Sequence, residues 1–345
     1  MARHINIPVF IPHLGCPNEC VFCNQRTISG VTEFDINSVR RNIDGVLSTV
    51  TESDECEIAF FGGSFTGIDR ELMLELLSIG KSYIDKGLVK SLRCSTRPDY
   101  ISPDILDLLR KYGVETIELG IQSVSDAVLS ACKRGHTNLE TKASCEMIIS
   151  YGFSLVGQMM IGLPGATVTD EINTATFIAD IGASAARIYP TVVFNDTELR
   201  YMKESEIYQP LSLDEAVERC AAAYEIFLQR GVKLLRVGLC SSENLLSDTT
   251  YNSGPNHSAI GELVENRIFL NRISDAFIRI PEPCGKSYII SVAPNAVSKA
   301  VGQNKKNKIA LIEGFSLKSL KFVSNKNLLG FDFVIEEERK NDECI

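Results

Sequence analysis

The chain has 345 residues, 44% of them hydrophobic and 23% charged, which is ordinary for a globular protein with a buried core. Its formal net charge of −9 excludes a globally basic nucleic-acid-binding protein, although a local basic patch can still contact phosphates. Because no apolar run matches a signal peptide or a membrane span, we expect a cytoplasmic protein with no membrane contact.

Short β-branched runs alternate with helical patterns over the first two thirds of the chain, which is typical of parallel βα units. The predicted strands are 5–11, 57–61, 92–95, 116–121, 154–161 and 186–192. The predicted helices between them are 36–50, 70–85, 103–112, 138–151 and 169–182. Six such repeats predict an α/β fold, a partial (βα)6 TIM-like barrel.

The pattern changes in the last third of the chain. A helix over 212–230 leads to an apolar strand at 233–237, which either closes or flanks the barrel. The following stretch is rich in Ser, Asn, Asp and Thr and predicts a loop, before an amphipathic helix at 259–273. We therefore expect a core domain over 1–240 and a small C-terminal α+β extension over 241–345, a candidate substrate-binding region. Its predicted elements are a strand, a helix and two strands, at 288–292, 295–302, 320–323 and 331–335.

Three cysteines, Cys16, Cys20 and Cys23, lie within eight positions directly after the first predicted strand. Three thiolates suit a [4Fe-4S] cluster, because the fourth iron then keeps open coordination sites for a substrate. The alternative is a zinc site, which needs a fourth ligand such as His13. Since the chain contains no second CxxC pair, we favour the iron-sulfur interpretation. The other eight cysteines are scattered and predict no auxiliary cluster.

Small and polar residues follow the second and third predicted strands. In the segment from Phe60 to Thr66, Gly62 and Gly63 allow close approach of a ligand and Ser64 can donate a hydrogen bond, although the segment alone is also a tight βα turn. Ser95 ends the third strand. In TIM-like barrels the carboxyl ends of the strands carry the catalytic residues, so we expect these side chains at that rim.

The fourth strand contains Glu118 and ends near Gln122. A carboxylate in an apolar strand is costly unless it is paired or binds a hydroxyl-bearing ligand, so a ribose contact and a salt bridge to a neighbouring arginine both stay open. Arg134 can clamp a carboxylate through two N–H groups. Gln158 is expected to face the barrel lumen, and Arg187 either does so or pairs with Glu118 in the core.

The CxxxCxxC spacing, with Phe22 before the last cysteine, resembles the radical S-adenosylmethionine (SAM) superfamily. The resemblance implies that SAM chelates the open iron and is reductively cleaved to a 5'-deoxyadenosyl radical, which abstracts hydrogen from a substrate. It also implies that 60–66 receives the methionyl amino group and that 1–240 forms the radical SAM barrel. The implied SAM contacts are Phe22, Gly62, Gly63, Ser64, Ser95, Glu118, Gln122, Arg134, Gln158 and Arg187.

Five segments, FFGGSFTG, STRPDYI, ELGIQS, KRGHT and MIGLPG, look like the elongator catalytic-subunit family and its shorter bacterial relatives, which are related to oxygen-independent coproporphyrinogen oxidases. Long members of that family modify the wobble uridine of tRNA with an acyl group from acetyl-CoA. Here Cys16 and Cys20 are closer together than in those members, and we expect no acetyltransferase domain. The position where the oxidases carry another cysteine is Gln25, which disfavours porphyrin chemistry.

The C-terminal extension is locally basic. Residues 285–335 contain eight lysines and only two acidic residues, Glu313 and Asp332, which gives a local charge of +6. These lysines either contact RNA phosphates or form a solvated surface.

Our first hypothesis is a radical SAM enzyme that modifies a tRNA base and is reduced by a donor such as flavodoxin or ferredoxin. The alternatives are a radical SAM enzyme for a small molecule, such as a porphyrin or cofactor precursor, and a non-catalytic zinc or Fe-S RNA-binding protein.

Overall fold

The computed structural model describes residues 3–11, 14–16, 20–24, 34–51, 53–239 and 251–338. The chain forms two compact units. Unit 1 comprises Met1–Ala216 and Ile226–Asn256, and unit 2 comprises Val217–Glu225 and His257–Ile345. The domain boundary predicted after residue 240 falls at a segment outside the described residues and stays a prediction.

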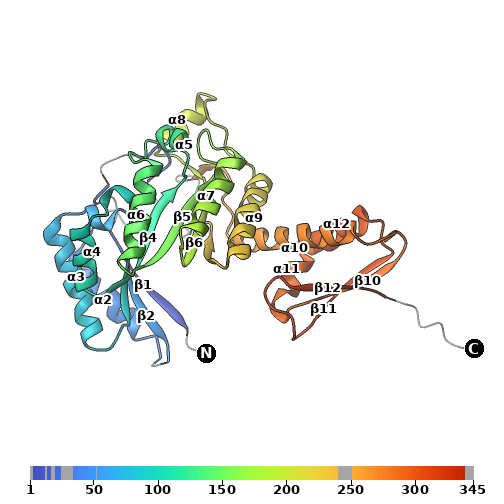
Figure 1. The fold of residues 1–345 in the computed structure, drawn as a ribbon, viewed down its shortest axis with the longest axis horizontal. Coiled ribbons are helices and arrows are strands. Elements are labelled where there is room, and N and C mark those ends of the chain that lie inside the picture. The colour runs from blue at the N-terminus through green and yellow to red at the C-terminus, as the bar shows by residue number, and fades with distance from the viewer. Residues whose placement is uncertain are drawn as a thin grey trace, which may run out of the picture. The chain divides into compact units, whose positions relative to one another are not determined.

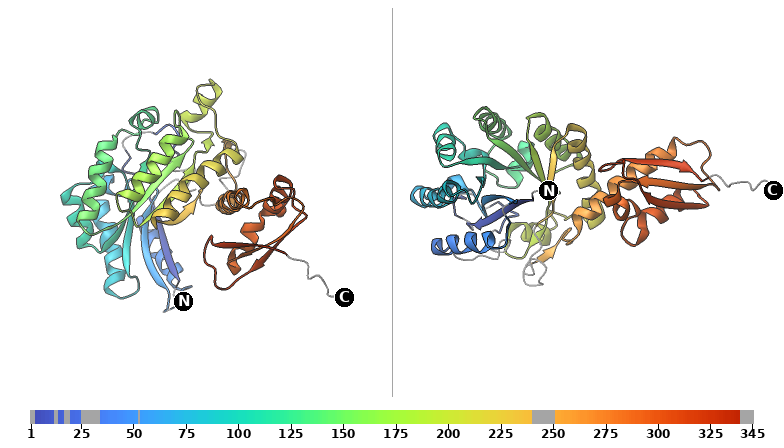
Figure 2. Two further views of the ribbon diagram at one scale, coloured as in Figure 1. Left: turned by 45° about the vertical axis from the view of Figure 1, so that its right-hand side comes forward. Right: turned by 90° about the horizontal axis from the view of Figure 1, so that it is seen from below.

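Unit 1 is built on one parallel sheet of seven strands in the order β1-β2-β3-β4-β5-β6-β8, which curls into an open half-barrel (Figures 1 and 2). This confirms the predicted α/β partial barrel. The seventh strand, β8, pairs with β6 and thus flanks the sheet. The strands are β1 His4–Phe10, β2 Glu55–Phe61, β3 Ser91–Thr96, β4 Val114–Gln122, β5 Ser154–Ile161, β6 Ala185–Pro190 and β8 Lys233–Val237.

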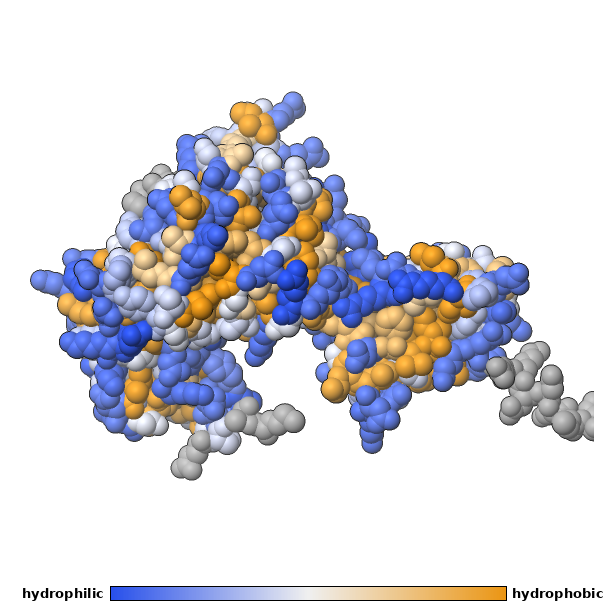
Figure 3. Space-filling model, viewed as in Figure 1, coloured by the Kyte–Doolittle hydropathy of each residue, from blue (hydrophilic) through white to orange (hydrophobic). Residues whose placement is uncertain are grey.

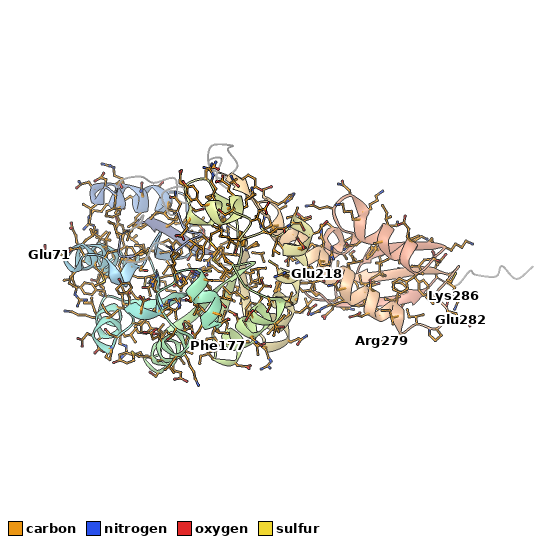
Figure 4. All side chains as sticks on the ribbon, turned by 90° about the horizontal axis from the view of Figure 1, so that it is seen from above. Glu71, Phe177, Glu218, Arg279, Glu282 and Lys286 are labelled. Carbon is orange, nitrogen blue, oxygen red and sulfur yellow. The ribbon has the colours of Figure 1, made fainter. Side chains whose placement is uncertain are left out.

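Helices cover the outer face of this sheet (Figure 2). They are α2 Ile36–Leu47, α3 Arg70–Asp85, α4 Pro103–Lys111, α6 Asn138–Ser150 and α7 Val168–Asp180. The helix α9, Leu213–Arg230, contributes its two ends to unit 1 and Val217–Glu225 to unit 2. Figure 4 labels Glu71 on α3 and Phe177 on α7, which belong to this helical layer. Several helices begin at capping boxes, in which a Thr or Ser side chain and a carboxylate three residues later satisfy the first backbone N–H groups.

Short elements that the sequence pattern did not predict surround the carboxyl ends of the strands. They are the helices α5 Asp126–Ala131 and α8 Glu198–Glu204, and the strand β7 Val193–Phe194, which pairs with β9 Tyr251–Ser253. Such elements are too short to show a helical or strand period. Among the helices of the described residues, none has the length and apolar character needed to cross a membrane.

The strands β2, β3 and β4 are buried on both faces over most of their length, which explains their nearly continuous apolar runs. Ile58 on β2, Leu92 on β3 and Ile117 on β4 are fully buried. Gly157 on β5 allows α7 to pack closely, because a Cβ there would lie 2.6 Å from Ile178. The few polar side chains within these apolar strands therefore indicate which face of the sheet lines the lumen of the half-barrel.

Unit 2 has its own hydrophobic core, centred on Phe277, Tyr288 and Ile290. Its sheet has the order β11-β10-β12, with β10 parallel to β11 and antiparallel to β12. Apolar and hydrophilic residues both reach its visible surface (Figure 3). Its elements are α10 Ile260–Ile278, β10 Ser287–Val292, α11 Val297–Val301, α12 Lys306–Gly314, β11 Ser319–Ser324 and β12 Phe333–Glu337.

The helix α12 corrects the predicted order of elements in the extension. The sequence pattern predicts one helix between the first two strands, whereas the structure has two, α11 and α12. The lysines at the start of α12 disguise its short apolar face, of which Leu311 is the fully buried part.

Candidate functional site

A cavity of about 510 Å³ lies in unit 1 at the carboxyl ends of the strands, within the size range of small-molecule sites. All but three of the predicted site residues line it, the exceptions being Gly62, Glu118 and Arg187. The lining residues are Cys16, Cys20, Phe22, Cys23, Asn24, Gly63, Ser64, Ser95, Thr96, Arg97, Gly120, Gln122, Arg134, Gln158, Asp196, Thr197 and Glu198.

The first cysteine is held against the turn that follows β2. The Sγ of Cys16 lies 3.4 Å from the Oγ of Ser64. Gly15 has φ +79°, and a Cβ at this position would lie 2.4 Å from the carbonyl oxygen of Ser64. A Cβ on Gly63 would likewise lie 2.8 Å from the carbonyl oxygen of Leu14. The two backbones therefore touch directly, and only glycine permits this contact.

The second and third cysteines share a tight turn. The backbone N–H of Cys23 donates to the carbonyl of Cys20 at 2.9 Å. Between them, Val21 donates to the carbonyl of Cys132 at 3.2 Å and accepts from the N–H of Leu199 at 2.8 Å. Phe22 packs in an apolar cluster that also contains Val21, Cys132 and Leu199. These contacts fix the turn to two segments that are distant in sequence.

Two buried arginines point toward the sulfur of Cys20. Arg134 donates from Nη1 to the Sγ at 3.4 Å and from Nη2 to the carbonyl of Gly120 at 2.7 Å. Arg97 approaches the same sulfur through Nη1 at 4.0 Å, is held by Asp99 at 2.9 and 3.0 Å, and also donates to the carbonyl of Arg134. Guanidinium donors of this kind stabilise negative charge on a sulfur ligand.

The three thiols fit a cluster with three protein ligands. They line one cavity and two cationic side chains face one of them. Within the described ranges, no three His, Cys, Asp or Glu side chains already form a metal-ligand group. His13, the ligand that the zinc alternative requires, lies outside the described residues.

Among the neutral side chains of the residues that line the cavity, two buried polar atoms lack a hydrogen-bond partner in the described part of the chain. They are the Oγ of Ser95 and the Oε1 of Gln122. Gln122 ends β4 with φ +63°, a left-handed conformation that is rare for residues other than glycine. Since buried polar groups are almost always hydrogen-bonded, these atoms can take part in hydrogen bonds to a molecule bound at this place.

A buried ionic network crosses the lumen. The carboxylate of Glu118 accepts from Arg93 at 2.8 Å, from Arg187 at 2.8 and 3.0 Å, and from Gln158 at 2.9 Å. Arg93 also pairs with Glu57 on β2 at 2.8 Å. Burial raises the pKa of Glu118, but the charges of Arg187 and Arg93 outweigh it and hold that pKa below its usual value.

This network bears on the two interpretations of Glu118. Its four hydrogen bonds occupy the four acceptor positions of a carboxylate, so the arrangement present is a salt bridge to Arg93 on the neighbouring β3 and to Arg187 on β6. Arg187 is its partner, as the alternative interpretation required. Gln158 lies between this network and the cavity, because it contacts Glu118 and also lines the site.

Seven lining residues were not among the predicted site residues. Thr96 and Arg97 directly follow Ser95, and their position at a strand end was the available signal. Gly120 leaves room for the side chain of Arg134, since a Cβ there would lie 3.1 Å from its guanidinium. Asn24 and the segment from Asp196 to Glu198 complete the lining, and no residue pattern marked that segment in the sequence.

The chain is similar to several known proteins. Residues 10–178 match the model of the Radical SAM superfamily, and residues 183–269 match that of the Radical_SAM C-terminal domain. A tRNA uridine(34) acetyltransferase of Methanocaldococcus jannaschii is 26% identical over 325 residues, covering 81% of this chain and 58% of that protein. Human Elongator complex protein 3 is 26% identical over 254 residues, covering 61% of this chain and 46% of that protein.

A solved structure has the same fold. The archaeal Methanocaldococcus infernus Elp3 with an N-terminal deletion superposes with a TM-score of 0.63 at 21% identity, covering 81% of this chain and 64% of that one. The chain spans little more than half the length of the first curated relatives, 53% and 58%. From the two family matches, the relatives and the shared fold, we conclude that this chain belongs to the radical SAM superfamily of enzymes.

Proposed function

We propose that this enzyme holds a [4Fe-4S] cluster on Cys16, Cys20 and Cys23 and binds SAM in the cavity beside them. The observation that carries the proposal is that Ser95 and Gln122, each with a buried polar atom that has no partner among the described residues, line the same cavity as the three cysteines. When bound, a reduced cluster of this type supplies the electron that divides SAM into methionine and a 5'-deoxyadenosyl radical, which takes a hydrogen atom from the substrate.

The lining residues would divide the binding of SAM among them. Ser64, Ser95 and Gln122 offer hydrogen bonds to the polar groups of the cofactor. Gly63 provides a surface without a side chain, where the backbone can approach the ligand closely. Arg134 would attract the cofactor's carboxylate while it remains directed at Cys20. Phe22 would cover the cofactor from the cysteine turn.

The remaining predicted contacts would act from outside the cavity. Glu118 accepts a hydrogen bond from the amide of Gln158 and is itself held by Arg187, so we propose that the two orient Gln158 toward the cofactor. Gly62, with φ +102° and an ideal Cβ only 3.0 Å from the backbone of Ile11, would shape the turn after β2.

We further propose that the substrate is an RNA, with a tRNA base as the group modified. The support is the likeness to proteins named tRNA uridine(34) acetyltransferase, together with the basic lysines of unit 2. The cleavage of SAM needs one electron, so a small electron-transfer protein such as flavodoxin or ferredoxin is the proposed donor.

The proposal is tested by anaerobic reconstitution with iron and sulfide, reduction with dithionite and chromatographic assay of 5'-deoxyadenosine with and without bulk tRNA. Cys20→Ala should lose iron and cleavage, whereas Cys284→Ala, an exposed cysteine of unit 2, should keep both. Cleavage stimulated by tRNA supports the RNA substrate, and cleavage indifferent to tRNA favours a small molecule. An iron-loaded protein that never cleaves SAM would refute the proposed chemistry.

A further inference from the structure

Unit 2 contains a strand–helix–helix–strand motif. The order is β10, α11, α12 and β11, with the two strands parallel and adjacent, and β12 adds a third strand on the other side of β10. Two helices joined by a short glycine-containing turn characterise KH modules, whose GXXG turn clamps the backbone of single-stranded RNA. The family matches end at residue 269, so they leave this motif unassigned.

The turn between α11 and α12 has the sequence Gly302-Gln-Asn-Lys305. Gly302 has φ +78°, and a Cβ there would lie 2.9 Å from the buried Asn307. Asn304 and Lys305 also have left-handed backbones, with φ +52° and +61°. Lys305 therefore takes, at the last position of the turn, a conformation that favours glycine. The side chain of Asn307 donates to the carbonyls of Asn266 at 2.7 Å and Ala300 at 3.2 Å, which anchors the turn from behind.

The turn carries positive charge that other described residues leave uncompensated. Lys305 precedes α12, and Lys306 and Lys308 lie in its first turn, where the helix dipole is also positive. None of the three forms an ion pair with another described residue. Elsewhere in unit 2, Lys286, Lys299 and Lys321 pair with glutamates at 2.5–3.4 Å. Three cations together with the free N–H groups of a helix start are complementary to phosphate.

The surface beside this turn suits bases. β11 is an edge strand of the sheet, so its outer N–H and C=O groups pair with no other strand of the described residues. α12 packs next to β11 and leaves the side chain of Ile309 exposed (47%). Backbone groups at a strand edge can hydrogen-bond base edges, and an apolar side chain can pack on their faces.

We propose that unit 2 is a KH-like module that binds single-stranded RNA. The turn of residues 302–305 and the three lysines contact the phosphates, and the bases lie along α12 and the edge of β11. The KH-like module would bind the substrate of the radical SAM site. That the bound RNA is the substrate rests on the proposed function.

The test measures the affinity of the full-length protein for a short fluorescent single-stranded RNA by anisotropy, over a range of salt concentrations. Replacing Lys305, Lys306 and Lys308 by Ala should weaken binding at least about tenfold and lower the slope of log affinity against log salt by about 2, because each phosphate contact on a single strand contributes about 0.7. The matched control removes the same charge from unit 1 through Lys81, Lys86 and Lys142, and should bind as wild type.

A second variant, Gln303→Asp with Asn304→Asp, places two carboxylates in the turn and should also weaken binding, because they repel phosphate. The turn should keep its shape, since Asp tolerates the left-handed backbone of Asn304. Equal weakening by the unit 1 control, equal affinity for double-stranded RNA, or equally good competition by a poly-glutamate peptide would overturn the proposal. All lysine variants should still cleave SAM without RNA. If the wild-type protein does not cleave SAM, the proposed chemistry is refuted but the KH-like module is not. If both turn variants bind RNA as the wild type does, the KH-like module is refuted but the proposed chemistry is not.

Discussion

The imidazole of His136 is enclosed behind the arginines of the site. Its side chain is fully buried, and its Nδ1 lies 3.9 Å from the carboxylate of Asp99. Neither ring nitrogen has a hydrogen-bond partner among the described residues. Burial, with the nearby charge of Arg134, lowers the pKa of His136 to about 4 from 6.5. At neutral pH this residue is therefore an uncharged neighbour of two cations.

This depressed pKa predicts a pH-dependent stability. Between pH 6.5 and 4 the unfolded chain binds a proton at His136 that the folded chain does not, so folding weakens as the pH falls through this range. The full effect is about 3 kcal/mol, because one pKa unit corresponds to 1.36 kcal/mol. Urea unfolding at several pH values should show a shallower acid loss for His136→Gln than for wild type. If the loss of stability with falling pH is the same in the variant and in the wild type, His136 is not its source.

At the scale of elements, the cysteine segment depends on contact between two backbones. Replacing Gly15 by Ala adds a Cβ 2.4 Å from the carbonyl oxygen of Ser64 at φ +79°. We expect a loss of at least about 2 kcal/mol in the free energy of unfolding, together with poor iron loading. Urea unfolding measures the free energy of unfolding, and iron analysis measures the iron loading.

Gly45→Ala is the matched control for this substitution. Gly45 lies inside α2, where a Cβ would meet nothing within 4 Å. Removing a glycine from a helix interior should stabilise the protein by up to about 1 kcal/mol and leave iron loading unchanged. Full iron loading of Gly15→Ala at wild-type stability would contradict the described contact.

The ionic network across the lumen ties β2, β3, β4, β5 and β6 together. Glu118→Gln removes the charge that two buried arginines share, so we expect unfolding to become easier by about 3–5 kcal/mol. Glu115→Gln on the exposed side of the same strand is the control and should change stability little. Thermal or urea unfolding of the two variants makes the comparison. Equal stability of both would mean that the network contributes nothing.

At the scale of the whole molecule, iron removal should leave the fold intact. Unit 2 has an apolar core of its own, and the strands of unit 1 are packed by Ile58, Leu92 and Ile117, away from the cysteines. Anaerobic chelation should therefore abolish colour and SAM cleavage but preserve the far-ultraviolet circular dichroism. A collapse of the helical signal would instead indicate a domain whose folding depends on its metal.

The sequence by itself determined the barrel and predicted most of the residues found to line the cavity. Six of the seven sheet strands follow from apolar runs that alternate with helical periods, and β8 from an apolar run after α9. The position of the cavity followed from polar and small residues at strand ends, because parallel strands bring their carboxyl ends to one rim. Cys16, Ser64 and Gln158 thus reach the same cavity although they are far apart in sequence.

Only the tertiary structure decided which partners the polar residues take. A single strand cannot show that Glu118 faces Arg93 on one side and Arg187 on the other, because those pairs depend on strand order and register. The second helix of unit 2 was missed because its charged first turn conceals a face that only packing against α10 and β11 defines. Asp196 reaches the cavity from a segment beyond the sixth strand, and no local pattern specifies such a long-range approach.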